Sequence, residues 1–195
     1  MSTIKAFFGR IFAPQKRVIE GKRTLLFATG IYLLLLIWAI VFKFSFISEI
    51  NINSSQPLLE RFWRGFHFFD YLFNNNPWRL IRGLLISILN VLLFVPWGIY
   101  ASFFYNPKRS VVFACIFSCA VECIQLFARF GVFSFEDVAL NTLGALFGVL
   151  LYAKYINRIS ENTQQRINQW TVRIGGPFAA LAYINVIVSM IFYFS

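Results

Sequence analysis

One carboxylic acid, Glu122, lies inside the long apolar stretch SVVFACIFSCAVECIQLF. An acidic side chain at the centre of a membrane helix costs about 2.5–3.5 kcal/mol on insertion scales, so it normally faces a partner or a water-filled cavity. At about 100° per residue, one face of this helix gathers four polar side chains: Ser118, Glu122, Gln125 and Arg129. Such a stripe could hydrogen-bond the polar group of a ligand, and a buried carboxylate could also act as a general base.

The next apolar stretch carries a second stripe, in which small residues follow the polar ones. Its members lie on one helix face and are Asp137, Asn141, Gly144 and Gly148. Asp137 is expected to cap the start of the helix, with its carboxylate accepting backbone N–H groups near the positive end of the helix dipole. Gly144 and Gly148 form a G-x-x-x-G pair, which lets another helix approach closely. We expect this pair to serve packing within the chain.

The preceding apolar stretch contributes Asn90, with Ser87 nearby on the same side. Further along that helix, Pro96 removes a backbone hydrogen bond and should bend the helix. We expect Pro96 and Gly98 to serve helix packing. At about 1.5 Å per residue, the polar residues of all three helices fall about 6–12 Å inside the outer membrane boundary.

These depths predict a small polar pocket among the three helices, open toward the extracytoplasmic side. Its ligand-binding residues would be Asn90, Glu122, Gln125, Arg129, Asp137 and Asn141. The alternative is that the same groups pair with one another only to hold the helices together, since polar contacts of that kind average about 0.6 kcal/mol. A carboxylate is a poor choice for that purpose when Gln would serve, which favours the pocket.

The composition shows that membrane helices must position these residues. Of the 195 residues, 58% are hydrophobic and only 13% are charged, whereas soluble domains average about 45–50% apolar and about 25% charged residues. The net charge of +10 comes from basic residues that lie between the apolar stretches and form no groove-reading motif. They fit topology signals and contact with anionic lipids, so we expect membrane lipids as partners and no nucleic acid.

Five apolar stretches predict five transmembrane helices in an all-α, polytopic membrane protein. They are residues 24–42, 83–105, 110–127, 138–153 and 175–195. Residues 1–23 are interpreted as a basic cytoplasmic leader that precedes an uncleaved first helix, and residues 24–195 as one membrane domain. Lysine and arginine are more numerous on the side of the leader, which predicts a cytoplasmic N-terminus and an extracytoplasmic C-terminus.

Residues 57–73, on the predicted outer side, place aromatic and aliphatic residues at helical spacing with charged residues between them. This pattern predicts an extracytoplasmic amphipathic helix that lies along the membrane interface and stops at Asn74–Pro77. His67, the sole histidine, is expected to be a solvated residue of that helix.

The three cysteines, Cys115, Cys119 and Cys123, lie along one face of a single helix and cannot form a disulfide framework. No second cluster of cysteine or histidine would complete a metal site. We expect these residues to serve packing and expect neither a metal nor a cofactor. The oligomeric state is not predicted.

Three motifs resemble those of the VanZ family of bacterial membrane proteins. Asn90 to Gly98 is similar to its N-x-x-x-F-x-P-x-G segment, Glu122 and Gln125 fit its E-x-x-Q, and Asp137 to Gly148 fits its D-x-x-x-N-x-x-G-x-x-x-G. The resemblance covers about residues 31–152, with the motifs in the family's order. One departure is Ser134, at a place where many members carry an aspartate.

The resemblance implies resistance to lipoglycopeptide antibiotics such as teicoplanin, which act outside the bacterial cytoplasmic membrane on lipid-linked cell-wall precursors. We expect a non-catalytic protein of that membrane, whose pocket binds an amphiphilic ligand, either the lipopeptide drug or a wall-precursor lipid. The alternative is an intramembrane enzyme that modifies a lipid or lipid-linked precursor with Glu122 as general base, although a second catalytic partner is missing. A small transporter is less favoured because no inverted repeat is evident.

Overall fold

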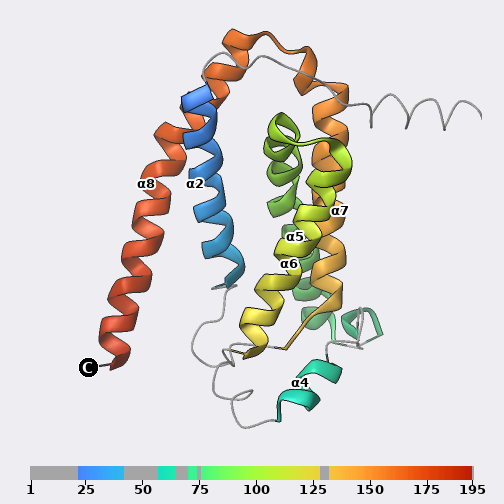
Figure 1. Cartoon of the computed structure of the whole chain (residues 1–195). Coiled ribbons are helices and arrows are strands. Elements are labelled where there is room, and N and C mark those ends of the chain that lie inside the picture. The colour runs from blue at the N-terminus through green and yellow to red at the C-terminus, as the bar shows by residue number, and fades with distance from the viewer. Residues whose placement is uncertain (1–21, 42–56, 65–69, 74–75, 128–131, 195) are drawn as a thin grey trace, which may run out of the picture. The chain divides into compact units, whose positions relative to one another are not determined.

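The computed structural model describes residues 22–41, 57–64, 70–73, 76–127 and 132–194. All regular structure in these ranges is helical, which confirms the all-α prediction for this part of the chain (Figure 1). Residues 1–21 of the predicted leader, Arg129 and His67 lie outside the described residues, and the last two residues of the leader, Lys22 and Arg23, begin α2.

Among the described residues, four helices are long and apolar enough to cross a membrane. They are α2 (Lys22–Val41), α5 (Pro77–Phe104), α6 (Pro107–Phe127) and α7 (Phe135–Lys154). The predicted fifth span falls within α8 (Glu161–Phe194), a continuous helix of 34 residues that is not among these four. The short 3-10 helix η2 (Ile156–Arg158) lies between α7 and α8.

Two helices begin earlier than the apolar stretches predicted, because Asn-Pro pairs start them. The side chain of Asn76 accepts a hydrogen bond from Trp78 N at 3.0 Å, and Pro77 occupies the first turn of α5. In the same way, Asn106 Oδ1 accepts from Arg109 N at 2.9 Å ahead of α6. The segment interpreted as the stop of the interfacial helix is therefore in part the start of α5.

The chain divides into two compact units, which are described separately. One contains α4 (Leu58–Arg64), η1 (Asp70–Phe73), α5, α6 and α7. In it α5 packs along α7, α6 lies against both, and α4 lies near the end where α5 and α7 begin (Figure 1). The other contains α2 and α8, which pack against each other.

The predicted interfacial helix over residues 57–73 is described in two pieces, α4 and η1, with residues 65–69 outside the described part. Both pieces expose large apolar side chains. The exposed residues are Leu58, Leu59, Trp63, Leu72 and Phe73. In the other direction, the ring of Phe62 packs against Phe133 and Phe135 at the start of α7, with ring centroids 5.8 and 5.9 Å away.

Candidate functional site

The site is held by an unusually close approach of α5 to α7, at three glycines. A Cβ placed on Gly148 would lie 2.9 Å from Gly98 Cα, and one on Gly98 would lie 2.7 Å from Val149 N. A Cβ on Gly144 would lie 2.9 Å from Val91 C. The two backbones touch directly, so the glycines fix both the separation and the register of these helices. That register brings the polar residues of α5 level with the first turns of α7.

Two hydrogen bonds join α5 to the start of α7. Asn90 Nδ2 donates to Asp137 Oδ1, and both side chains are buried. About one turn earlier on α5, Ser87 Oγ donates to Glu136 Oε1 at 3.0 Å. The adjacent carboxylates of Glu136 and Asp137 on α7 thus each accept a hydrogen bond from a side chain on the same face of α5. Sequence reasoning placed Ser87 beside Asn90 but gave neither residue its partner and left Glu136 out of the site.

Glu122 lies on α6 and is 1% exposed. Its Oε2 accepts a hydrogen bond from the backbone N–H of Ser134 at 2.8 Å. Ser134 precedes α7, so this bond ties the carboxylate of α6 to the loop that enters the next helix. The carboxylate lies with the other polar groups near the end of the unit where α5 and α7 begin.

The cap of α7 is Ser134, which corrects the prediction that Asp137 caps this helix. Ser134 Oγ accepts from Asp137 N at 3.1 Å, as an N-cap side chain does for the third residue of a helix. Asp137 is that third residue, and its carboxylate accepts from Asn90 instead. Serine and aspartate are both good N-caps, so an aspartate at this position could fill the same capping role.

We expect Ser134→Ala to lower the free energy of unfolding by about 1 kcal/mol, because it removes the cap of α7. Ser134→Asp should stay within a few tenths of a kcal/mol of the natural protein. The backbone bond from Ser134 to Glu122 persists in both variants, so the comparison isolates the side chain. Thermal unfolding of the detergent-purified proteins measures the difference. Equal destabilisation by Ala and Asp would contradict the capping role.

One turn farther into the unit, Asn141 of α7 is paired with Ser118 of α6. Asn141 Nδ2 donates to Ser118 Oγ at 2.8 Å, and the two residues are 2% and 1% exposed. Among the described residues, Asn141 Oδ1 receives no hydrogen bond. A buried acceptor without a donor costs about 1–3 kcal/mol, so this amide could accept from a group that the described chain does not supply.

The structure thus brings together most of the predicted site residues. Asn90, Glu122, Asp137 and Asn141 are connected through the α5–α7 and α6–α7 contacts, and Gln125 is buried on α6 one turn beyond Glu122. Pro96 lies inside α5 without ending it. Several of these hydrogen bonds are interhelical pairs, as the packing alternative requires. The pocket, and a binding role for any of these residues, stays a prediction.

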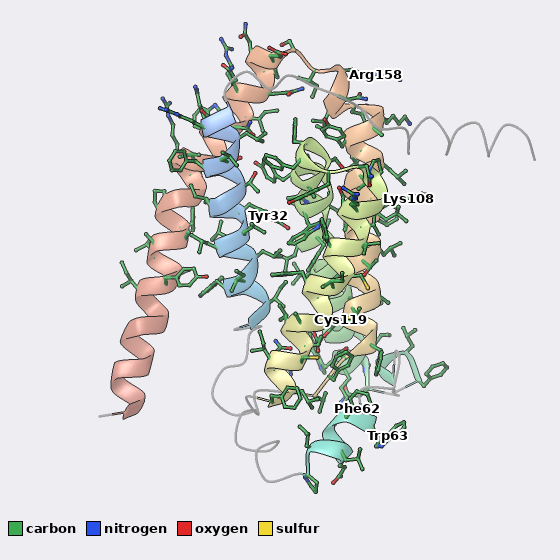
Figure 2. The ribbon with its side chains drawn as sticks, in the orientation of Figure 1. Tyr32, Phe62, Trp63, Lys108, Cys119 and Arg158 are labelled. Atoms are coloured by element: carbon green, nitrogen blue, oxygen red, sulfur yellow. The ribbon has the colours of Figure 1, made fainter. Side chains whose placement is uncertain are left out.

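Aromatic side chains surround Ser134, the residue whose backbone N–H donates to Glu122. Phe133 and Phe135 flank Ser134, with ring centroids 4.7 Å apart, and Phe62 of α4 packs against both. Figure 2 shows where Phe62 lies on α4. Trp63, the next residue on α4, is 58% exposed. The polar groups therefore lie beneath aromatic side chains at one end of the unit, and α4 also presents apolar side chains outward.

Chemically, the arrangement offers hydrogen-bond acceptors in apolar surroundings. Three carboxylates, those of Glu122, Glu136 and Asp137, lie around the start of α7, together with the amides of Asn90 and Asn141. Such groups can hold a donor-bearing polar group of a ligand. In the part of the chain that is described, no group of three or more histidine, cysteine or acidic side chains could hold a metal ion.

Comparison with known proteins shows a family and a similar protein. A sequence model of the family described as VanZ/LLP1 matches residues 29–157. The chain is similar to Protein VanZ of Enterococcus faecium, with 25% identity over 143 residues that make up 71% of this chain and 79% of that protein. No solved structure matches the chain.

Proposed function

The chain belongs to the VanZ/LLP1 family, and from this membership we propose that it protects the cell against lipoglycopeptide antibiotics such as teicoplanin. Its apolar helices make it a multi-pass membrane protein. The protective role would be non-catalytic. The protein would bind the polar part of an amphiphile, either the drug or a lipid-linked wall precursor, at the cluster around Glu122.

The observation that carries this proposal is the placement of Glu122. The side chain is almost fully buried, and its Oε2 accepts a hydrogen bond from the backbone N–H of Ser134, the residue that caps α7 at the end of the unit. A residue that served only to join two helices would not need a charge, because an amide makes the same bonds without the cost of burying a carboxylate. The buried Asn141 Oδ1, one turn deeper, adds an acceptor that a ligand could use.

The exposed apolar side chains of α4 support an amphiphilic ligand. Leu59 and Trp63 are 66% and 58% exposed on a helix whose other side packs over the loop before α7. We expect α4 to lie in the outer membrane interface, where such side chains meet lipid tails or the acyl chain of the drug. The polar part of the same molecule would then lie within reach of Glu122.

The proposed topology has the N-terminus in the cytoplasm and the C-terminus outside, with α8 as the fifth span. The parallel course of α2 and α8 supports it, because two parallel helices that cross the membrane begin on the same side. The polar start of α8 would then lie on the cytoplasmic side, together with the start of α2. The end of the first unit that holds Glu122 would face outward.

Glu122→Gln and Glu122→Ala should both abolish most of the teicoplanin resistance that the natural protein gives a susceptible host. Glu161→Gln is the matched control, since it neutralises an exposed carboxylate at the start of α8. Drug susceptibility is measured beside the amount of protein in the membrane fraction. Full resistance in both Glu122 variants, at natural protein levels, would remove the proposal.

The same strains also test whether the protein is a catalyst. Membrane lipids and wall precursors are compared by mass spectrometry with and without expression. The non-catalytic proposal expects identical masses in all strains. A new mass that disappears in Glu122→Gln would show instead an enzyme with this carboxylate as general base.

A further inference from the structure

The two helices of the second unit run parallel and in a defined register. A Cβ on Gly175 would lie 3.1 Å from Ile31 Cγ2, and one on Gly176 would lie 3.7 Å from Ile31 Cδ1. Farther along both helices, Tyr183 Oη donates to the carbonyl of Leu34 at 3.0 Å. Both α2 and α8 therefore begin at the same end of the unit (Figure 1).

This register places Arg173 deeper than the sequence suggested. The candidate membrane span of α2 is Arg23–Ile40, about 27 Å long. A span of this length places Arg23 near one membrane boundary when α2 crosses the membrane. Arg173 comes two residues before Gly175 and is therefore level with about Thr29. That level is six residues, or about 9 Å, beyond Arg23. Arg173 is therefore part of a helix and not of a loop, and it is level with the candidate membrane span of α2.

Arg173 belongs to a stripe on the face of α8 that is turned away from α2. The stripe consists of Arg166, Trp170 and Arg173, whose spacing of four and three residues keeps them on one side of the helix. All three are exposed, Trp170 by 60%, whereas Asn168 and Ala179 on the opposite side are buried. In the described part of the chain, neither Arg166 nor Arg173 takes part in an ion pair.

The surroundings at this level are apolar. Leu26 and Phe27 of α2, one turn beyond its start, are 54% and 67% exposed. An unpaired guanidinium at this depth would be costly, unless its long side chain reaches back to an anion at the membrane surface. Arginine binds phosphate oxygens through paired N–H groups, and tryptophan is enriched at the level of lipid head groups. The stripe therefore matches the chemistry of a phospholipid phosphate.

We propose that Arg166, Trp170 and Arg173 form a binding site for the head group of an anionic phospholipid, in the leaflet where α2 and α8 begin. Two guanidinium groups face one phosphate, so a lipid without a compensating choline or ethanolamine cation fits better than a zwitterionic one. The lipid would let the polar first half of α8 enter the membrane beside α2. This inference does not depend on the antibiotic function.

The test is native mass spectrometry of the full chain released from mixed micelles. The micelles contain equal amounts of phosphatidylglycerol and phosphatidylcholine with identical acyl chains, and the ratio of the two lipids retained on the protein is measured. The natural protein should favour phosphatidylglycerol. Arg173→Gln should lower the ratio about fivefold, the value expected when one arginine near an anionic surface is lost. Arg166→Gln should lower it in the same direction.

Arg79→Gln is the matched control, since it removes an exposed arginine from α5 in the other unit. It should leave the ratio unchanged. An equal fall in Arg79→Gln, or an unchanged ratio in Arg173→Gln, would overturn the site. If Arg173→Gln does not fold, Arg166→Gln decides the outcome by itself, because that exposed residue lies closest to the start of α8.

Two further results would replace the lipid by another occupant. Displacement of phosphatidylglycerol by an excess of inorganic phosphate would show a site for soluble anions. A dimer mass that disappears with Arg173→Gln, without bound lipid in the natural protein, would show that a second copy of the chain covers the stripe. Either result would contradict the proposal.

Discussion

Gly148→Ala is expected to leave little folded protein, although it adds only one methyl group. The new Cβ would lie 2.9 Å from Gly98 Cα and 3.0 Å from Ile99 N, and real Cβ atoms do not approach backbone atoms so closely. Its neighbours belong to the backbone of α5, which cannot move aside as a flexible side chain can. Overpacking in cores typically lowers the free energy of unfolding by about 1–3 kcal/mol. For Gly148→Ala we expect a loss of about 3 kcal/mol or more.

Thermal unfolding and size-exclusion chromatography in detergent measure this loss. Gly30→Ala is the matched control, because a Cβ there meets no atom within 4 Å on a helix of similar apolar character. It should be neutral or slightly stabilising, since alanine has the higher helix propensity. If both variants unfold at the same temperature as the natural protein, α5 and α7 are not in direct backbone contact.

The sequence predicted this close approach but not its partner. The G-x-x-x-G spacing of Gly144 and Gly148 shows that one helix face is flat, and any of the other helices could have packed against it. Gly98 complements that face only once α5 and α7 run parallel in the observed register. Helix rotation and register depend on all contacts of the unit together, and a local pattern does not contain them.

Helix starts were predicted less well for an identifiable reason. Hydropathy marks where a helix enters the apolar layer, whereas the helix itself begins at its cap. Asn76 and Pro77 were interpreted as the end of the preceding segment, but an Asn-Pro pair serves equally well to start a helix. The same error moved the cap of α7 from Ser134 to Asp137, because the helix was expected to begin only at residue 138.

The shared helix faces of the polar residues follow from helix periodicity alone. Asn90, Glu122, Asp137 and Asn141 are all buried, as their positions on otherwise apolar helices indicated. Their pairing could not be predicted from periodicity. Which amide meets which carboxylate depends on offsets of a few ångströms between helices, which the glycine contacts set.

Asn90→Leu should lower the free energy of unfolding by about 2–4 kcal/mol. It removes the amide that donates a hydrogen bond to the carboxylate of Asp137, a residue that is only 8% exposed. Asp137→Leu should cost about 1–3 kcal/mol, since it leaves the buried amide of Asn90 without this acceptor. The double variant removes both polar groups. The double variant should lose less free energy of unfolding than the two single variants lose together, by about 1–3 kcal/mol. Unfolding of all four proteins in the same detergent measures this coupling.

A second double-mutant cycle, on Ser87 and Glu136, provides a control nearby. Because the hydrogen bond between these side chains is only partly buried, their coupling energy should be less than about 1 kcal/mol. Additive effects in the Asn90–Asp137 cycle would show that the two side chains do not meet in the membrane.

The double variant also separates packing from ligand binding, which stability alone does not. If Asn90 and Asp137 serve only to join α5 to α7, a folded double variant should protect against teicoplanin as well as the natural protein does. If they contribute polar contacts to a ligand, leucine at both positions should reduce resistance even when the protein is folded and abundant. We expect the second outcome, because Asp137 lies beside the loop that holds Glu122.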